Sequence, residues 1–127
     1  MQTTASKKML RAGQVLTALP ALLMLSAAIP KLFAAAAVVE AFKQDGYPAS
    51  LIPIVGIIEL ACTAVYLIPR TQVLGAILMT GLLGGAVATN VRVGDPTWIA
   101  PALIGVLAWG GLFFRDSRLR ALIPLRG

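Results

Sequence analysis

The sequence predicts an all-α integral membrane protein, a single domain spanning residues 1–127 and folded as a four-helix bundle. Hydrophobic residues make up 58% of the chain and charged residues 13%, whereas a soluble domain carries about a quarter charged residues. The mean hydropathy is +0.86. Four stretches reach the length of about 20 mostly apolar residues that crosses a bilayer. These observations exclude a soluble globular domain and a disordered chain.

The four spans are read from the gaps between charged residues. We expect them at about residues 12–31, 49–69, 71–92 and 97–114. Only the second contains a charge well inside its apolar run, Glu59. Chain-breaking sequences separate the spans, namely Gly46-Tyr47-Pro48, Pro69-Arg70 and Gly94-Asp95-Pro96.

The basic residues predict the orientation of the bundle. With both termini and Arg70 on the inner side, eight Lys and Arg lie inside and three (Lys31, Lys43 and Arg92) lie outside. This excess satisfies the positive-inside rule with cytoplasmic N and C termini. We therefore expect a multi-pass protein of the bacterial inner membrane. The net charge of +6 then reflects topology and contact with anionic membrane lipids rather than nucleic acid.

Two segments outside the spans are typical of helices that lie at the membrane surface. Residues 34–45 place Val38, Val39 and Phe42 on one helical face, and Gly46 fits the C-terminal cap. Residues 115–125 alternate arginine with leucine and isoleucine. We expect both segments to form short amphipathic interfacial helices.

Small residues predict where the spans approach one another. Membrane helices associate through close packing at such positions, and Gly81 and Gly85 form a GxxxG pair. The pattern favours contacts within the bundle ahead of a homo-oligomer. The candidate packing positions are Gly56, Gly81, Gly84, Gly85, Ala88 and Gly105.

Glu59 is the candidate catalytic residue. It lies about ten residues from either end of the second span, which at about 1.5 Å per residue places it roughly 15 Å deep. A carboxylate at that depth costs a few kcal/mol unless it is paired, hydrated or protonated. It could handle a proton or bind a ligand. The alternative is a structural role, in which Glu59 bonds a neighbouring helix.

Other polar residues predict a vestibule above Glu59. Lys31, Arg92 and Asn90 lie near the outer ends of their spans, and the candidate ligand-binding set adds Glu40, Tyr66 and Trp109. Arg92 is too far above the midplane to reach Glu59 directly, so Asn90 is the better neighbour. Lys31 and Arg92 could instead extend to lipid headgroups, and Trp109 is more often a packing residue.

The chain lacks the residues that several kinds of site need. The chain has no histidine and one cysteine, Cys62, so it cannot form an internal disulfide, and the usual metal ligands are missing. Haem would normally need a histidine or another axial ligand. The glycines at 81–85 lie inside an apolar span and not in a nucleotide-binding loop. We expect no metal site and no cofactor belonging to the chain itself.

Several short motifs, taken in order, carry a resemblance to a known family. They are Pro30-Lys31-Leu32, Val39-Glu40-Ala41-Phe42 with Gly46-Tyr47-Pro48, Gly56-Ile57-Ile58-Glu59-Leu60, Leu67-Ile68-Pro69-Arg70-Thr71, and the run from Gly84 to Arg92. From about residue 12 to 126 the sequence resembles the DoxX-like family of small bacterial membrane proteins. Relatives often carry His where Asn90 stands, which argues against a proton relay through this position.

The resemblance implies a four-helix membrane bundle and a link to membrane oxidoreductase systems, among them a thiosulfate:quinone oxidoreductase. The first hypothesis is therefore an oxidoreductase subunit that binds a quinone or another lipophilic molecule around Glu59. The second is a non-catalytic anchor that recruits an oxidoreductase subunit at the cytoplasmic face through its arginine-rich tail. The third is a pathway for protons or a small solute.

Overall fold

The computed structural model describes residues 7–122, which form helices joined by short turns and contain no β-strand. Four helical segments are long and apolar enough to cross a membrane. They are α1 (Lys7–Leu32), η1 with α3 (Ala49–Leu51 and Ile52–Leu67), η2 with α4 (Pro69–Thr71 and Gln72–Arg92), and η3 with α5 (Pro96–Trp98 and Ile99–Arg115). The predicted all-α fold with four spanning helices is confirmed. The cytoplasmic placement of the termini stays a prediction from the charge count.

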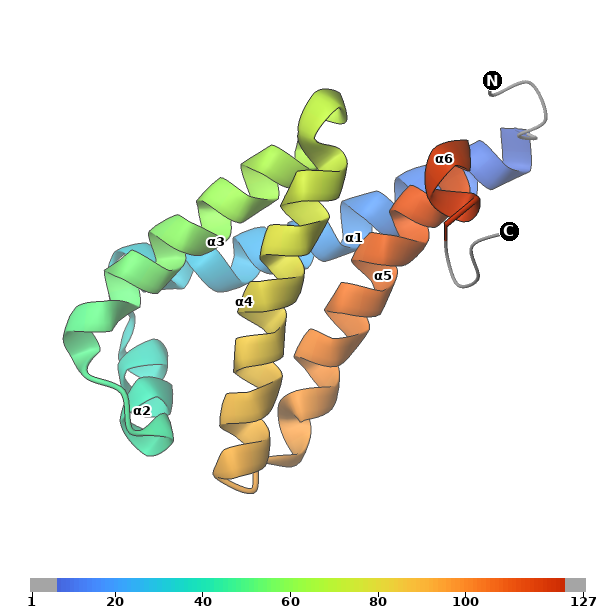
Figure 1. Cartoon of the computed structure of the whole chain (residues 1–127). Helices are drawn as coiled ribbons and strands as arrows, with labels where there is room; N and C mark the ends of the chain where they lie inside the picture. Colours follow the sequence, from blue (N-terminus) through green and yellow to red (C-terminus); the bar gives the residue numbers. More distant parts are fainter. Residues whose placement is uncertain (1–6, 123–127) are drawn as a thin grey trace.

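The four long helices form a closed ring of contacts. Helix α1 packs against α3 and α5, and α4 packs against the same two helices from the other side. Figure 1 shows that the start of α1, α6 (Ser117–Arg120) and the α3–α4 turn lie toward one end of the bundle. We call this the α6 end. Helix α2 (Ala36–Asp45) and the α4–α5 turn lie toward the opposite end, the α2 end.

The turn after α2 follows from its sequence. Gly46 adopts a φ of +83°, a left-handed conformation that glycine reaches without the steric penalty of a side chain. In this position its backbone N–H bonds the Lys43 carbonyl, and the Tyr47 N–H bonds the Phe42 carbonyl. The predicted cap at Gly46 is confirmed. It directs the chain from α2 back toward α3 and leaves Tyr47 beside the bundle.

The tightest packing lies where α3 meets α4. The Tyr66 side chain is fully buried and its hydroxyl donates a 2.7 Å hydrogen bond to the Ala108 carbonyl of α5. A Cβ added to Gly75 would come within 2.3 Å of the Tyr66 backbone. Only a residue without a side chain therefore allows α4 to pass this close to α3. Met79 and Leu112 extend the same buried cluster.

The glycines that the sequence suggested for helix packing differ in their surroundings. Gly56 is buried against α1, where an added Cβ would lie 2.9 Å from the Lys31 Cβ. A Cβ added to Gly81, Gly84 or Gly85 would meet nothing within 4 Å. The buried positions of α4 are Gly75, Ala76, Met79 and Leu83. The GxxxG pair lies away from this buried face, so it does not pack the bundle. Ala88 is likewise exposed, and Gly105 makes only an ordinary contact of 3.8 Å with Leu83.

The basic segment after α5 folds back onto the bundle. Arg115 donates a hydrogen bond of 2.9 Å to the Thr17 hydroxyl on α1, and Arg120 donates one of 2.7 Å to the Phe113 carbonyl. Arg118 differs, because 91% of its side chain is exposed. Part of the surface helix expected at 115–125 lies beyond the described residues. Within them, α6 covers Ser117–Arg120.

Candidate functional site

The centre of the site is an ion pair between α1 and α3. Lys31 Nζ lies 2.6 Å from Glu59 Oε1, and the two side chains are 16% and 7% exposed. Lys31 Nζ also donates a 3.1 Å hydrogen bond to the Ala27 carbonyl. An ammonium and a carboxylate removed from water need such a partner, since an isolated charge there is strongly destabilising. Glu59 therefore has a charged neighbour that the sequence did not assign to it.

Gly56 explains how Lys31 reaches Glu59. Because Gly56 lacks a side chain, α1 lies directly against α3 at this level, with the Lys31 Cβ and the Ala28 carbonyl beside it. Glu59 follows Gly56 by three residues, so both occupy one face of α3. The long lysine side chain then covers the remaining distance to the carboxylate. The ion pair depends on the close approach of the two helices.

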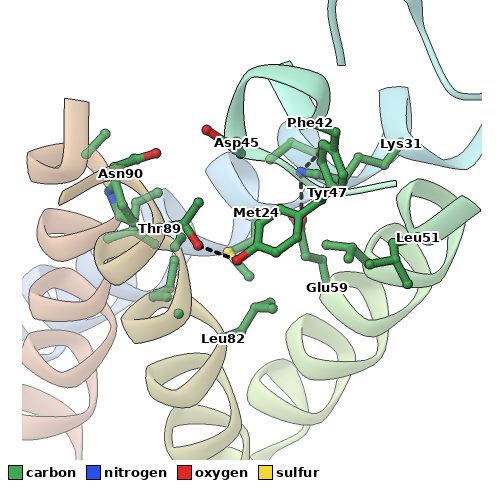
Figure 2. Close-up of a pocket in the computed structure, with 18 residues that line it drawn as sticks. Met24, Lys31, Phe42, Asp45, Tyr47, Leu51, Glu59, Leu82, Thr89 and Asn90 are labelled. Carbon is green, nitrogen blue, oxygen red and sulfur yellow. Dashed lines mark hydrogen bonds and ion pairs between the residues drawn. The ribbon is translucent and has the colours of Figure 1, made fainter. Parts of the chain in front are cut away.

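A cavity of about 440 Å³ opens beside the ion pair. Its volume falls within the range of small-molecule sites, about 300–1,000 Å³. Apolar residues form most of the wall, including Met24, Leu82 and Ile104. Figure 2 shows Glu59 and Lys31 on one side of this space and Asn90 on the other. The arrangement is a mostly apolar pocket with a few polar groups facing inward.

Two polar groups of the wall are available to a ligand. No buried side-chain nitrogen or oxygen in residues 7–122 lacks a partner. Glu59 Oε1 bonds Lys31, and the Glu59 side chain lines the cavity. The Asn90 side chain lines the cavity, and none of the hydrogen bonds among residues 7–122 uses its amide. The site thus presents a carboxylate oxygen and an amide from opposite walls.

Helix α2 and the segment after it cover the cavity. The hydroxyls of Tyr47 and Thr89 share a hydrogen bond of 2.8 Å, drawn in Figure 2. Arg92 of α4 donates to the Asp45 carbonyl at the end of α2. Phe42 packs against Tyr47 with ring centroids 6.2 Å apart. Helix α2 itself contributes no fully buried residue, and the hydrogen bonds of Tyr47 and of the Asp45 carbonyl connect this segment to α4.

The structure brings together three of the predicted site residues and separates the others. Lys31, Glu59 and Asn90 line the cavity. Arg92 does not line it and bonds α2 instead of Glu59. Glu40 is exposed on α2.

The two predicted aromatic residues also lie apart from this cavity. The Tyr66 hydroxyl is committed to the Ala108 carbonyl. The Trp109 indole donates to the Thr80 hydroxyl at 2.7 Å, in a different groove. Tyr66 is on the same face of α3 as Glu59 but about two turns further from the α2 end, and the contact with Gly75 encloses it there.

Sequence reasoning missed the polar residues that α4, the end of α2 and the turn after it contribute. Asp45, Tyr47 and Thr89 line the cavity, together with Phe42 and Met24. Tyr47 was visible only as part of the Gly46-Tyr47-Pro48 turn. Nothing in the sequence indicated that its hydroxyl meets Thr89, which is 42 positions away.

The site limits the chemistry that the chain can perform by itself. Among residues 7–122, no three Cys, Asp or Glu side chains gather as they would around a metal ion. The Lys31–Glu59 ion pair is neutral as a whole and Asp45 adds a carboxyl group to the wall, so the cavity suits an uncharged molecule better than an anion. Lysine and asparagine can donate hydrogen bonds to it, and Glu59 can accept one or exchange a proton.

The fold and the cavity define a small multi-pass membrane protein with a mostly apolar cavity among its helices. The chain belongs to the DoxX-like family, whose sequence profile it matches over residues 15–111. That range includes Lys31, Glu59 and Asn90. No match was found among curated proteins or among solved structures.

Proposed function

We propose that this protein binds a quinone, or a lipophilic molecule with a similar carbonyl-bearing head, in the cavity beside Glu59. In this role it is a membrane subunit of an oxidoreductase system in the bacterial inner membrane. The observation that carries the proposal is the Lys31–Glu59 ion pair of 2.6 Å at the edge of a mostly apolar cavity. Membrane proteins retain ionisable groups at such depth mainly where those groups act.

The residues of the cavity fit the head of such a molecule. A quinone head is uncharged and planar, and it offers carbonyl oxygens that accept hydrogen bonds. Lys31 and the Asn90 amide can donate to these oxygens, and the apolar wall contacts the ring. The positive charge of Lys31 would also stabilise negative charge that develops on an oxygen nearby.

In the proposal Glu59 exchanges a proton with the ligand. Its carboxylate can receive a proton from a hydroxyl of the bound head or return one to it, while Lys31 holds the carboxylate in place. A bound quinone would supply the electron-accepting chemistry. In this proposal the electrons come from a partner oxidoreductase subunit.

The partner subunit would bind at the α6 end, which we expect to face the cytoplasm. Arg118 is well exposed there, whereas Arg115 and Arg120 are bonded to the bundle. The alternative function, an anchor without a ligand, uses the same surface and leaves the cavity without a role. The test of ligand binding therefore separates the two functions.

The experiment is a binding titration in lipid nanodiscs with decylubiquinone, together with mass spectrometry of quinones that co-purify with the protein. The variant is Glu59→Gln, and the matched control is Glu40→Gln, which changes an exposed carboxylate outside the cavity. We expect Glu59→Gln to weaken binding about tenfold or more, since hydrogen bonds to charged groups contribute about 1.5–3 kcal/mol.

Glu40→Gln should bind like the wild type. Circular dichroism would verify that both variants fold. Equal affinity of the two variants, or a wild type that binds no quinone, would overturn the proposal and leave the anchor function.

A further inference from the structure

A second groove runs along the outside of the α4–α5 contact. It has a volume of about 440 Å³ and follows both helices from Leu83 and Pro101 to Trp109. Along α5 the distance from Pro101 to Trp109 is eight residues, or about 12 Å. This length suits an extended hydrocarbon chain better than a ring or a headgroup.

The groove adjoins the cavity beside Glu59. Leu83 and Pro101 line both spaces. A molecule whose head lies in the cavity therefore has the start of the groove next to it.

The two spaces differ in their available polar groups. In the groove, the Trp109 indole N–H is bonded to the Thr80 hydroxyl, and that hydroxyl donates to the Ala76 carbonyl at 2.7 Å. The two polar side chains of the groove are therefore satisfied by the protein itself. The cavity, in contrast, is lined by the Glu59 carboxylate and the Asn90 amide. The groove is thus chemically matched to hydrocarbon, and the cavity is matched to a polar head.

Glycines provide the room along the groove. Gly84 has no atom within 4 Å of an added Cβ, and the nearest atom to a Cβ at Gly105 is a Leu83 methyl at 3.8 Å. Larger residues at these positions would fill the groove without disturbing the helix contacts. The open glycines thus have a use that packing within the bundle does not explain.

We propose that the α4–α5 groove binds the apolar chain, isoprenoid or acyl, of the same molecule whose head lies beside Glu59. This inference rests on the proposed function and extends it. The ligand is then a head-and-chain lipid, with its head between Glu59 and Asn90 and its chain directed along α5 toward Trp109.

The test compares two quinones in nanodiscs: a ubiquinone without a side chain and a ubiquinone with two isoprene units. Gly84→Leu fills the groove. Gly81→Leu is the matched control, because Gly81 is equally open on the same helix but does not line the groove. Partition of the longer quinone into lipid is the same for every variant and cancels in the comparison.

We expect the longer quinone to lose roughly fivefold to tenfold in affinity on Gly84→Leu, because its chain loses many small van der Waals contacts. The quinone without a side chain should bind the wild type and both variants equally. Gly81→Leu should behave like the wild type with both ligands.

Each other result has a distinct meaning. If Gly84→Leu binds the longer quinone as Gly81→Leu does, the chain lies elsewhere and the inference is wrong while the proposed function stands. If the quinone without a side chain does not bind the wild type, the head site is wrong, and the inference falls with it. A change of oligomeric state on Gly84→Leu, seen by native mass spectrometry, would mean that a second copy covers the groove, and it would overturn the inference.

Discussion

The two ends of the bundle use similar residues in opposite ways. Toward the α6 end, Arg115 of α5 bonds Thr17 of α1, and Tyr66 bonds Ala108, with the helices in close contact around them. At the α2 end, Lys31 of α1 bonds Glu59 of α3 beside about 440 Å³ of open space. Each end thus has a basic side chain that links α1 to another helix, and the cavity beside Glu59 lies at the α2 end.

The difference lies in the direction that the glycines face. Gly75 and Gly111 face neighbouring helices, where an added Cβ would collide with Tyr66 or Thr17. Gly84 and Gly85 face open space and border the groove and the cavity. The α6 end is therefore a tightly packed framework, and the α2 end is the part that can accept a ligand. The predictions below test this division, beginning with the largest expected effect.

Removing the charge of Lys31 should destabilise the protein most. Lys31→Met leaves the Glu59 carboxylate without its partner, and removal of one member of a buried pair costs about 3–5 kcal/mol. Equilibrium unfolding in detergent would measure the decrease in the free energy of unfolding. Lys43→Met, at an exposed position on α2, is the control and should have little effect.

The double variant Lys31→Met/Glu59→Leu should recover most of the stability, because it removes the unpaired charge as well. If Lys31→Met is no less stable than Lys43→Met, the ion pair does not contribute to the stability of the fold.

Two glycine-to-alanine changes on α4 should have opposite consequences. Gly75→Ala forces α3 and α4 apart at Tyr66, and overpacking of this kind costs about 1–3 kcal/mol. Gly84→Ala meets no neighbour and gains the better helix propensity of alanine, so it should be neutral or stabilising by up to about 1 kcal/mol. Thermal unfolding of the two variants and the wild type measures the change in melting temperature. Equal melting temperatures would mean that the α6 end is not more tightly packed.

A tyrosine-to-phenylalanine change at two positions should distinguish the tightly packed α6 end from the α2 segment that covers the cavity. Tyr66→Phe removes a buried hydrogen bond to Ala108 and should cost about 1 kcal/mol of stability. Tyr47→Phe removes the bond to Thr89 at an exposed position and should change stability by less than about 0.5 kcal/mol. Instead it should speed hydrogen exchange in α2 while exchange in α3 stays unchanged. Unchanged hydrogen exchange in α2 would show that the Tyr47–Thr89 hydrogen bond does not hold α2 over the cavity.

The smallest effect concerns the turn that joins α4 and α5. The backbone N–H and the hydroxyl of Thr97 both bond the Asp95 carboxylate, and they hold its pKa below the ordinary value for aspartate. These contacts favour the ionised form. The stability they contribute is therefore complete above the pKa of an unfolded aspartate, and it is lost as the pH falls through the lowered pKa.

Thr97→Val removes the hydroxyl donor and keeps the N–H, so the pKa of Asp95 should rise part of the way back. A carboxyl NMR titration of the two proteins measures the shift. An identical titration in the variant would show that the hydroxyl does not contribute.

The sequence by itself determined the fold class and the approximate spans. Four apolar runs interrupted by charges and turn residues are sufficient for this, because each helix in a membrane must satisfy its own backbone hydrogen bonds and reach a length near 20 residues. The same reasoning identified Glu59, since a charge in the middle of an apolar run is visible without any partner. Gly46 was likewise a local feature, because a helix end depends on its immediate neighbours.

The tertiary structure decided which residues meet. The pairing of Glu59 with Lys31, where the sequence suggested Asn90 as the neighbour, depends on the level at which α1 crosses α3, and Gly56 lies at that level. The role of each glycine depends on which face of α4 is buried, and the GxxxG spacing cannot show this. The hydrogen bond between Tyr47 and Thr89 forms only because α2 folds back over the bundle. A sequence records the order of residues along each helix, whereas the register and facing of neighbouring helices arise from packing all four together.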